Sequence, residues 1–494
     1  MNDRSQPSLL GLELPAPEPG REPQPQALAE GQRVVRVVPD VVGIEKEFDY
    51  LVPAGVEVHV GDVVRIKLGP RRVGGWITEV DVAPPSGVTL SPLAKVSGRG
   101  PQPELVELAA WAAWRWAGRR PHFLRTASPP AVVRTLPVAA ARTPIGDPSA
   151  EDSTTAAALA ATRGVLRLAP GADRYALVLA AVRATSPVDG GRTLVLCPSL
   201  AEAQLLGGRL RRDGILTAVV ASEAPGAAGA GEWARARAGA AVVGARAGAW
   251  APVEPLGRVV VLDEHDEGYQ GEATPTWHAR DVAVERARRA GAPCLLVSPT
   301  PTLEALAWGE LIVPPRGQER AGWARTEVVD QRELDPSLGP LFSPALVRLV
   351  RGGGRTLCVL NRTGRARLLA CGACATLARC AVCDAAVALV EASVEDDDGH
   401  GAPPAPHFAC GRCGTERPMV CLSCGGSRFK NLRLGVSKAR EELEVLAGEP
   451  VIEVTGTTAL HDPGVGGGRL PLGTEAVAPL PCRAAAIALL DSHH

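Results

Sequence analysis

Lysine is scarce in this chain of 494 residues. It supplies only five of the 53 basic side chains, and arginine supplies the rest. Aromatic residues are also rare, at 3%. The 54 acidic residues leave a formal net charge of −1. This balance excludes the uniform positive field of proteins that coat nucleic acid unselectively. Any binding of nucleic acid must therefore use a local patch of the surface.

Long apolar runs are absent as well. No stretch approaches the roughly 18 uncharged apolar residues that a membrane span requires. The N-terminus also lacks the apolar segment of a secretory signal. These absences predict a cytoplasmic protein without a membrane partner.

The chain is too long for one hydrophobic core, and its composition changes several times along its length. Residues 1–30 are rich in Pro, Glu, Gln and Gly, and predict a disordered tail. Short β-branched runs separated by turn residues predict a small β domain over residues 31–98. Apolar residues at helical spacing begin near residue 104 and predict a small helical module over residues 99–148.

Two α/β regions make up most of the remaining chain. Between residues 149 and 330, continuous apolar runs alternate with helical stretches, which predicts βαβ units and a covered parallel sheet. A second α/β region, residues 331–369 and 425–494, is interrupted by a cysteine-rich segment, residues 370–424. The expected fold class is therefore multidomain α/β, with an N-terminal β domain and an inserted cysteine module.

Eight of the 12 cysteines form four CxxC pairs inside this insertion. The pairs are Cys371 with Cys374, Cys380 with Cys383, Cys410 with Cys413, and Cys421 with Cys424. One CxxC turn aims two thiolates at an ion, and two such turns complete a tetrahedral site. Eight thiolates therefore predict two closed zinc sites, rather than a disulfide framework. Unrelated reduced thiols and a redox-active pair are the alternatives.

The sequence VVVLDEHDEGY at residues 259–269 is typical of nucleotide hydrolases, in which an apolar strand runs into carboxylates that hold magnesium. Further motifs are FDYLVPAG and GDVVRIKLG near the N-terminus, VVGARAGAW, WHARDVAVERAR and SPTPTLEAL around the acidic motif, and VLNRTGRARLLACGACATLARCAVCD at the first cysteines. With these motifs in this order, the chain resembles the PriA family of bacterial replication-restart helicases from about residue 33 onward.

The resemblance implies a 3′-end DNA-binding β domain, a winged-helix-like module and two RecA-like lobes, the second incomplete and carrying a two-zinc insertion. It assigns one zinc ion to Cys371, Cys374, Cys421 and Cys424, and the other to Cys380, Cys383, Cys410 and Cys413. It also implies a nucleoid-associated monomer. The implied partners are DNA forks and 3′ ends, other primosome proteins and single-strand-binding protein.

The resemblance places a pocket for a 3′-terminal nucleotide at Phe48, Asp49 and Tyr50. Aromatic faces can stack on a base, and a carboxylate can accept a hydrogen bond from a sugar hydroxyl. Period-two spacing puts Phe48 and Tyr50 on the same face of a strand, so packing of Tyr50 in a β core is the alternative. Lys95 is a further candidate, because it matches a basic residue near that pocket.

The nucleotide site departs from the family pattern. Where a P-loop should follow the first strand of the α/β region, the chain reads RLAPGADRYALVLA, with Asp173 and Arg174 in the place of Gly-Lys-Thr. A P-loop needs glycines for the phosphate cradle, a lysine for the phosphates and a hydroxyl for magnesium. A guanidinium does not replace the compact ammonium of lysine there. The sequence therefore predicts a degenerate nucleotide site.

The acidic motif also departs from the family pattern. Counted back from His265, the family's first three acidic positions fall on Leu262, Asp263 and Glu264, so one carboxylate is missing or displaced. The family's arginine-bearing glycine motif and C-terminal domain are expected after GTEAVAPL and AIALLD, and the sequence contains neither. We therefore expect two zinc ions, no working ATP site and no catalytic residue.

The expected function is that of a PriA-like primosomal protein, which binds branched DNA at stalled forks and helps to restart replication without helicase activity. One alternative is an active ATP-dependent 3′–5′ DNA helicase with an atypical nucleotide site. Another is a zinc-containing platform for protein interactions. ATP turnover separates the first two functions, and affinity for forked DNA separates the third.

Overall fold

The computed structural model describes the chain in twelve stretches and one single residue. They are residues 32–44, 46–83, 88–137, 152–185, 191–220, 226–330, 341–360, 369–390, 406–431, 436–454, 468–474, 477 and 484–490. The chain divides into two compact units, residues 1–325 and 326–494. No helix within the described stretches is long and apolar enough to cross a membrane.

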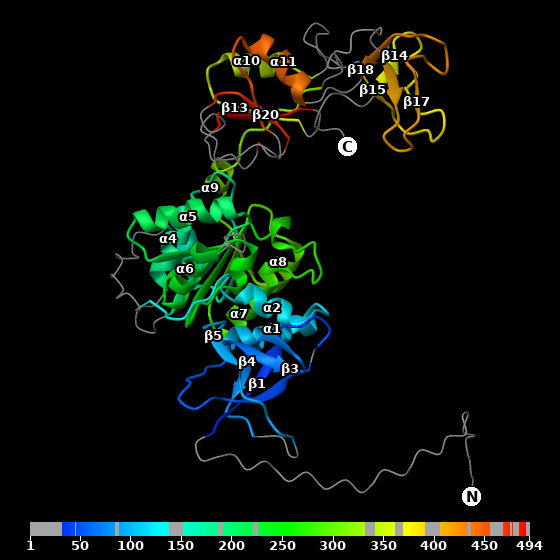
Figure 1. The fold of residues 1–494 in the computed structure, drawn as a ribbon. Coiled ribbons are helices and arrows are strands. Elements are labelled where there is room, and N and C mark those ends of the chain that lie inside the picture. Colours follow the sequence, from blue (N-terminus) through cyan, green and yellow to red (C-terminus); the bar gives the residue numbers. More distant parts are fainter. Residues whose placement is uncertain are drawn as a thin grey trace, which may run out of the picture. The chain divides into compact units, whose positions relative to one another are not determined.

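An antiparallel sheet of five strands begins the first unit, drawn in blue in Figure 1. Its strands are β1 (Val34–Pro39), β2 (Phe48–Leu51), β3 (Val63–Leu68), β4 (Arg71–Val80) and β5 (Lys95–Gly98), in the order β2-β1-β4-β3-β5. Alternate aliphatic residues, among them Val35, Val64 and Ile77, pack into one core. Pro92 bridges to Leu51 of the opposite edge strand, so the sheet curls towards closure. We call residues 32–98 the sheet domain.

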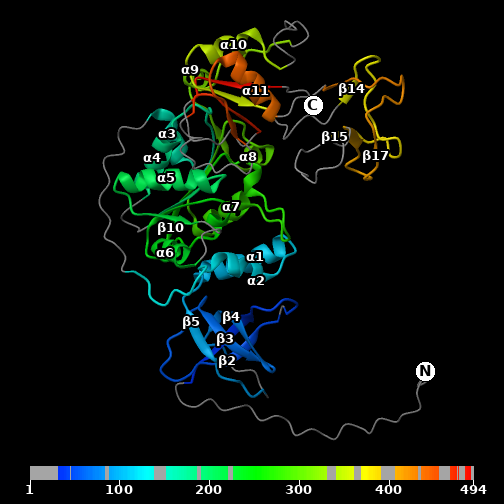
Figure 2. The same ribbon diagram turned by 45° about the horizontal axis from the view of Figure 1, so that its top comes forward.

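Two helices follow the sheet domain, α1 (Pro103–Arg115) and α2 (Arg120–Ala127). Their apolar faces share a continuous core with Trp76 of β4 and with Trp250 further along the unit. Figures 1 and 2 both show this helix pair between the two sheets of the unit. In the described part of residues 99–148 the structure contains no β-hairpin. The winged-helix-like module therefore stays a prediction.

The rest of the first unit is a parallel sheet of seven strands covered by helices, which we call lobe 1. The strands are β6 (Arg163–Arg167), β7 (Arg192–Leu196), β8 (Thr217–Val220), β9 (Ala241–Gly244), β10 (Leu256–Leu262), β11 (Cys294–Ser298) and β12 (Glu310–Ile312), in the order β12-β6-β11-β10-β7-β9-β8. The helices are α3 (Ser153–Ala160), α4 (Arg174–Ala184), α5 (Leu200–Arg212), α6 (Gly226–Arg237), α7 (Ala279–Ala290), α8 (Leu303–Trp308) and α9 (Arg316–Ala321), with short 3₁₀ helices at Arg246–Trp250 and Glu267–Tyr269.

The central strand β10 shows why these apolar runs are continuous. Val259 and Val261 pack into the core that contains α7, whereas Val260 and Leu262 pack into the core that contains α4. Both faces of the strand are therefore covered, as the sequence predicted for a parallel sheet.

The second unit contains a smaller parallel sheet of four strands in the order β19-β20-β13-β21. Its elements are α10 (Pro344–Arg351), β13 (Thr356–Val359), α11 (Val436–Ala447), β19 (Ile452–Val454), β20 (Pro471–Gly473) and β21 (Ala486–Leu489). Phe342, Leu443 and Leu472 lie in its core.

The inserted cysteine-rich segment forms its own small structure in this unit. Its strands are β14 (Leu369–Cys371), β15 (Ala388–Val390), β16 (His407–Ala409), β17 (Glu416–Pro418) and β18 (Phe429–Asn431). Antiparallel pairing of β14 with β18 closes the segment, and the rings of Phe408 and Phe429 pack edge to face at 4.8 Å. The insertion therefore extends over residues 369–431, beyond the predicted 370–424. We call it the cysteine module.

Candidate metal centres, nucleotide site and DNA-binding domain

The four CxxC turns of the cysteine module have the same backbone structure. In the first, the amide of Cys371 donates to the carbonyl of Thr376 (2.9 Å), and the amide of Ala375 donates to the carbonyl of Cys371 (3.0 Å). Corresponding bonds form at the turns that begin with Cys380, Cys410 and Cys421. The fourth residue after the first cysteine has a positive φ in each turn, namely Ala375 (59°), Asp384 (57°), Gly414 (72°) and Gly425 (72°). This reversal turns both thiols to the same side.

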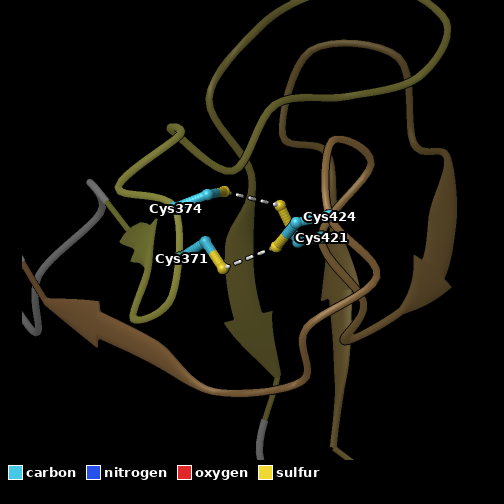
Figure 3. A group of neighbouring side chains, drawn as sticks. All are labelled: Cys371, Cys374, Cys421 and Cys424. Atoms are coloured by element: carbon cyan, nitrogen blue, oxygen red, sulfur yellow. Dashed lines mark hydrogen bonds between the residues drawn. The ribbon is translucent and has the colours of Figure 1, made fainter.

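The four turns meet in two clusters. In one, Cys371 Sγ lies 3.4 Å from Cys424 Sγ and Cys374 Sγ lies 3.6 Å from Cys421 Sγ, as Figure 3 shows. The other cluster joins the turns of Cys380 and Cys410 at Sγ–Sγ distances of 3.5 Å. The four sulfurs of each cluster lie within 4.8 Å of one another.

These distances suit a metal ion better than a disulfide. Tetrahedral zinc with Zn–S bonds of about 2.3 Å separates its sulfurs by ~3.8 Å. A disulfide bond measures about 2.0 Å. Both clusters therefore fit a zinc ion, and their membership is the one that the resemblance implied.

Each cluster combines thiols of different acidity. Hydrogen bonds with the hydroxyl and amide of Thr376 lower the pKa of Cys374 to about 6, and Thr415 has the same effect on Cys413. At Cys424 the amide of Gly426 lowers the pKa, but the neighbouring thiols raise it more, to about 12. The thiolate is the form that binds a metal, so an ion would replace the protons held in each cluster.

In lobe 1, the loop between β6 and α4 lies where the P-loop was expected. The carboxylate of Asp173 caps α4, because its Oδ1 accepts from the amides of Tyr175 (3.0 Å) and Ala176 (3.4 Å). Amides at a helix N-terminus are the groups that hold phosphate in a nucleotide site. The amide of Gly171 is also occupied, since it donates to the carbonyl of Gly322 at 2.9 Å. These donors are therefore satisfied within the chain.

A guanidinium occupies the acidic side of the same site. Arg174 forms an ion pair with Asp263, which follows directly after β10 and is buried. Burial raises the pKa of Asp263 above its ordinary value, and the charge of Arg174 opposes that shift. Leu262, at the first acidic position of the family motif, lies in the core. The carboxylate that follows β10 is thus paired with the arginine at the start of α4.

Glu264 is fully buried in a network that the sequence analysis missed. Its carboxylate accepts from the amide of Thr302 (2.7 Å), the hydroxyl of Thr302 (2.9 Å) and Nη1 of Arg280 (2.8 Å). Next to it, Nδ1 of His265 lies 2.8 Å from Oγ of Ser298. The network joins the DEHD, HARD and SPTPT motifs, whose shared polar residues were the available signal. Glu264 is therefore fixed by lobe 1 itself.

The candidate 3′-end residues lie on β2 of the sheet domain. Phe48 and Tyr50 share one face, as the period-two spacing predicted, and both pack in or against the core. Tyr50 is only 4% exposed and its hydroxyl donates to the carbonyl of Lys67 at 3.0 Å. The base-stacking role expected for Tyr50 is therefore corrected to packing, because its ring has no free face.

The other two candidates are held differently. Asp49 points away from that core and pairs with Arg36, whose Nε lies 2.9 Å from Oδ1. Lys95 begins β5 and is exposed. The Pro92–Leu51 bridge brings the chain just before β5 next to the end of β2.

A family model of the PriA 3′DNA-binding domain (3′BD) matches residues 34–129 of the chain. The match therefore includes α1 and α2, beyond the predicted boundary at residue 98.

Relatives match over a longer stretch. The Probable replication restart protein PriA of Mycobacterium tuberculosis (strain CDC 1551 / Oshkosh) is 30% identical over 462 residues, which are 84% of this chain and 67% of the relative. Its counterpart from Mycobacterium leprae is 29% identical over 469 residues, 85% of this chain and 69% of that one.

Among solved structures, the Pyrococcus furiosus Hef helicase domain aligns with 41% of this chain and 43% of its own, at 16% identity and a TM-score of 0.27. A score this low adds nothing to the strand order described above.

Proposed function

Because the chain belongs to the PriA family of replication restart proteins, we propose that it binds branched DNA at stalled replication forks and helps to restart replication without unwinding DNA. Residues 31–98, extended by α1 and α2, form the 3′-end DNA-binding domain in this proposal. Residues 149–330 form one RecA-like lobe, and the residues from 331 to 494 that lie outside the cysteine module form the second, both acting as scaffold. The partners are forks, 3′ ends and other primosome proteins.

One observation carries the proposal that the chain acts without ATP hydrolysis, namely that its own side chains fill the nucleotide site. Asp173 is an anion at the helix N-terminus where a phosphate would bind. Arg174 pairs with Asp263, the carboxylate at the end of β10, where a magnesium ion would be held in a nucleotide hydrolase. Nucleotide binding would have to displace both contacts and overcome repulsion between Asp173 and the phosphates.

The two cysteine clusters would each hold one zinc ion. Cys371, Cys374, Cys421 and Cys424 supply one complete set of four thiolates, and Cys380, Cys383, Cys410 and Cys413 supply the other. Four protein ligands leave no position for water or substrate, so the ions would be structural rather than catalytic. Their binding energy would stabilise the fold of the cysteine module.

Recognition of the 3′ end would depend on Asp49 rather than on Tyr50. The Asp49 side chain is 12% exposed and is held by Arg36, which also contacts Glu79 at 3.2 Å. A carboxylate held in this way can accept a hydrogen bond from a terminal 3′ hydroxyl. Lys95 would contact the last nucleotide, whereas Phe48 is half-buried against the core on the opposite face of β2 and is left out of this pocket.

The test compares forks that carry a free 3′ hydroxyl with forks that carry a 3′ phosphate. We expect the wild type to prefer the free end, and Asp49→Ala to lose that preference with little change in affinity for the blocked fork. Glu79→Ala is the matched control, because it removes the other carboxylate bound to Arg36 and should keep the preference. Equal affinity of the wild type for both forks at matched salt would remove the end pocket. A wild type that binds no fork would overturn the proposed function.

A further inference from the structure

Acidic side chains in the sheet domain are all engaged. Every described aspartate and glutamate between residues 32 and 98 lies within ion-pair distance of a basic side chain. The pairs are Asp40 with Arg125, Glu47 with Arg120, Asp49 and Glu79 with Arg36, Glu57 and Asp62 with His59, Asp62 also with Arg99, and Asp81 with Arg33. The contacts with arginine reduce the negative charge that the domain presents to a ligand, whereas the contact of Glu57 with His59 does so only when the histidine is protonated.

Basic side chains on three neighbouring strands of the sheet domain are not paired with these acidic residues. Arg65 and Lys67 of β3, Arg71 and Arg72 of β4, and Lys95 of β5 are all exposed. None of them forms an ion pair with any residue that the structure describes. The near-neutral chain thus carries a concentrated positive charge on one part of the sheet domain.

Strand register puts four of these cations on one face. Arg65 and Lys67 are two residues apart on β3, so both leave the face opposite the buried Val64 and Ile66. Lys67 pairs with Arg72 across to β4, and Arg65 pairs with Lys95 across to β5. Partners in register point to the same side of a sheet.

Gly74 lies at the centre of this face, opposite Arg65 on β4. It has no side chain, so no side chain of its own separates the four cations. The nearest acid is Asp40, whose Cβ is 3.6 Å from the position of a Cβ on Gly74. Arg125 already neutralises Asp40, with Nε 2.8 Å from Oδ1. No uncompensated negative charge therefore lies beside Gly74 among the described residues.

The far end of the same face is covered. Val63 and Trp76 pack against α1 and α2, and the indole Nε1 of Trp76 donates to Oγ of Ser128 at 2.8 Å. None of the exposed large apolar side chains in the described stretches lies on β3, β4 or β5. A protein interface normally has an apolar core, so the exposed cationic end suits a phosphate polymer better than a protein partner.

We propose that Arg65, Lys67, Arg72 and Lys95 around Gly74 form a surface that binds the sugar-phosphate backbone of duplex DNA beside the 3′ end. This inference rests on the proposed DNA-binding function and adds a contact that is independent of base sequence and of the chemistry of the end. The cations are distributed over three strands instead of converging on one point. Such an array contacts successive phosphates, whereas a single phosphate needs a convergent site.

The test uses Arg65→Gln, Lys67→Gln and Arg72→Gln together, leaving the end-pocket candidate Lys95 in place. Blunt duplex with blocked 3′ ends is titrated at several salt concentrations. Each lost phosphate contact lowers the slope of log affinity against log salt by about 0.9, so the triple variant should lose about three from the slope. Its affinity near 0.1 M salt should fall at least about tenfold. The preference for forks with a free 3′ hydroxyl should stay unchanged.

Two further variants control for charge and for folding. Arg183→Gln, Arg212→Gln and Arg316→Gln remove three exposed cations of lobe 1 and should leave the slope as in the wild type. Gly74→Glu removes no cation but adds a carboxylate at the centre of the face, where a Cβ meets only ordinary contacts. It should also weaken duplex binding, and it should melt at the wild-type temperature within a few degrees.

Three results would overturn the inference while leaving fork binding intact. The first is an unchanged salt slope in the triple variant. The second is an equal loss of slope in the lobe 1 control. The third is binding of polyglutamate that is lost in the triple variant while its duplex affinity stays unchanged. A wild type that binds neither duplex nor fork would instead overturn the proposed function on which the inference rests.

Discussion

The cysteine module and the nucleotide site of lobe 1 are both places where the family binds an ion or a charged ligand, but they differ in how their polar groups are used. In the cysteine module, eight thiols point at one another in two groups, and no histidine or carboxylate among the described residues joins either group. At the nucleotide site, Asp173 caps a helix and Arg174 pairs with Asp263. The thiols of the cysteine module can therefore still bind an ion, whereas the polar groups of the nucleotide site are already paired within the chain.

The difference shows that the parallel sheet of lobe 1 does not depend on a bound ligand. Lobe 1 keeps the covered parallel sheet, and the buried Glu264 still ties three motifs together. These features stabilise the lobe whether or not a nucleotide binds. The cysteine clusters have no such second role, because the small module has a limited apolar core of its own and needs its ligands.

The largest effect is expected when the cysteine module loses a metal ion. We expect about two zinc ions per chain by elemental analysis. Cys374→Ser should lose an ion and unfold residues 369–431, because structural zinc contributes about 10–16 kcal/mol of apparent binding energy in small domains. Limited proteolysis reports the unfolding. Cys358→Ala, a buried cysteine of β13 outside both clusters, is the control and should retain both ions.

A Cys374→Ser protein with two ions and full protease resistance would show that the clusters are not required for folding. A ratio of one zinc ion per chain would contradict the grouping of the thiols into two sites.

A smaller effect is expected at Tyr50, a family motif residue that is retained without an exposed ring. Tyr50→Ala should cost about 3–5 kcal/mol of unfolding free energy, because it opens a cavity in the core of the sheet domain. Tyr50→Phe should cost about 1 kcal/mol through loss of the hydrogen bond to Lys67. Urea unfolding measures both. A stable Tyr50→Ala protein that loses only end binding would restore the stacking role.

These residues also show how far the sequence could be interpreted. The CxxC spacing predicted two closed sites, since the ligand geometry of such turns is local. Continuous apolar runs such as that of β10 predicted the covered parallel sheet, because a strand that is buried on both faces is apolar at successive positions. The burial of Tyr50 could not be decided, because alternation assigns a residue to a face but does not say which face is covered.

The contacts of the nucleotide site could not be predicted from the sequence. The departure from the P-loop pattern was visible, but the Arg174–Asp263 pair joins the start of α4 to the residue after β10 and depends on the packing of this helix against this strand. The positive face of the sheet domain was hidden for a related reason. Net charge sums all residues, whereas the free cations emerge only once the ion pairs of the acidic side chains are known.

The smallest effect concerns the helix cap that fills the phosphate position. Asp173→Ala should destabilise lobe 1 by about 1 kcal/mol. Asp152→Ala is the matched control, because Asp152 caps α3 in the same way with its Oδ1 on the amides of Thr154 and Thr155. Millimolar phosphate should then stabilise the Asp173 variant more than the control, since α4 begins directly after the loop that stands at the P-loop position. No loss of stability in Asp173→Ala would mean that the carboxylate does not hold the helix.

If the nucleotide site is filled by the chain itself while DNA binding persists, both properties should be found together in one protein sample. Binding and hydrolysis of Mg·ATP are measured with and without forked DNA, on a single preparation whose fork affinity is known. We predict fork binding with no saturable ATP binding at millimolar nucleotide and no DNA-stimulated phosphate release, because loss of a single charge-stabilising group can already cost 10³ to 10⁵ in rate. ATP turnover that is stimulated by forks and abolished by Asp263→Asn would contradict the claim and identify the chain as an active helicase.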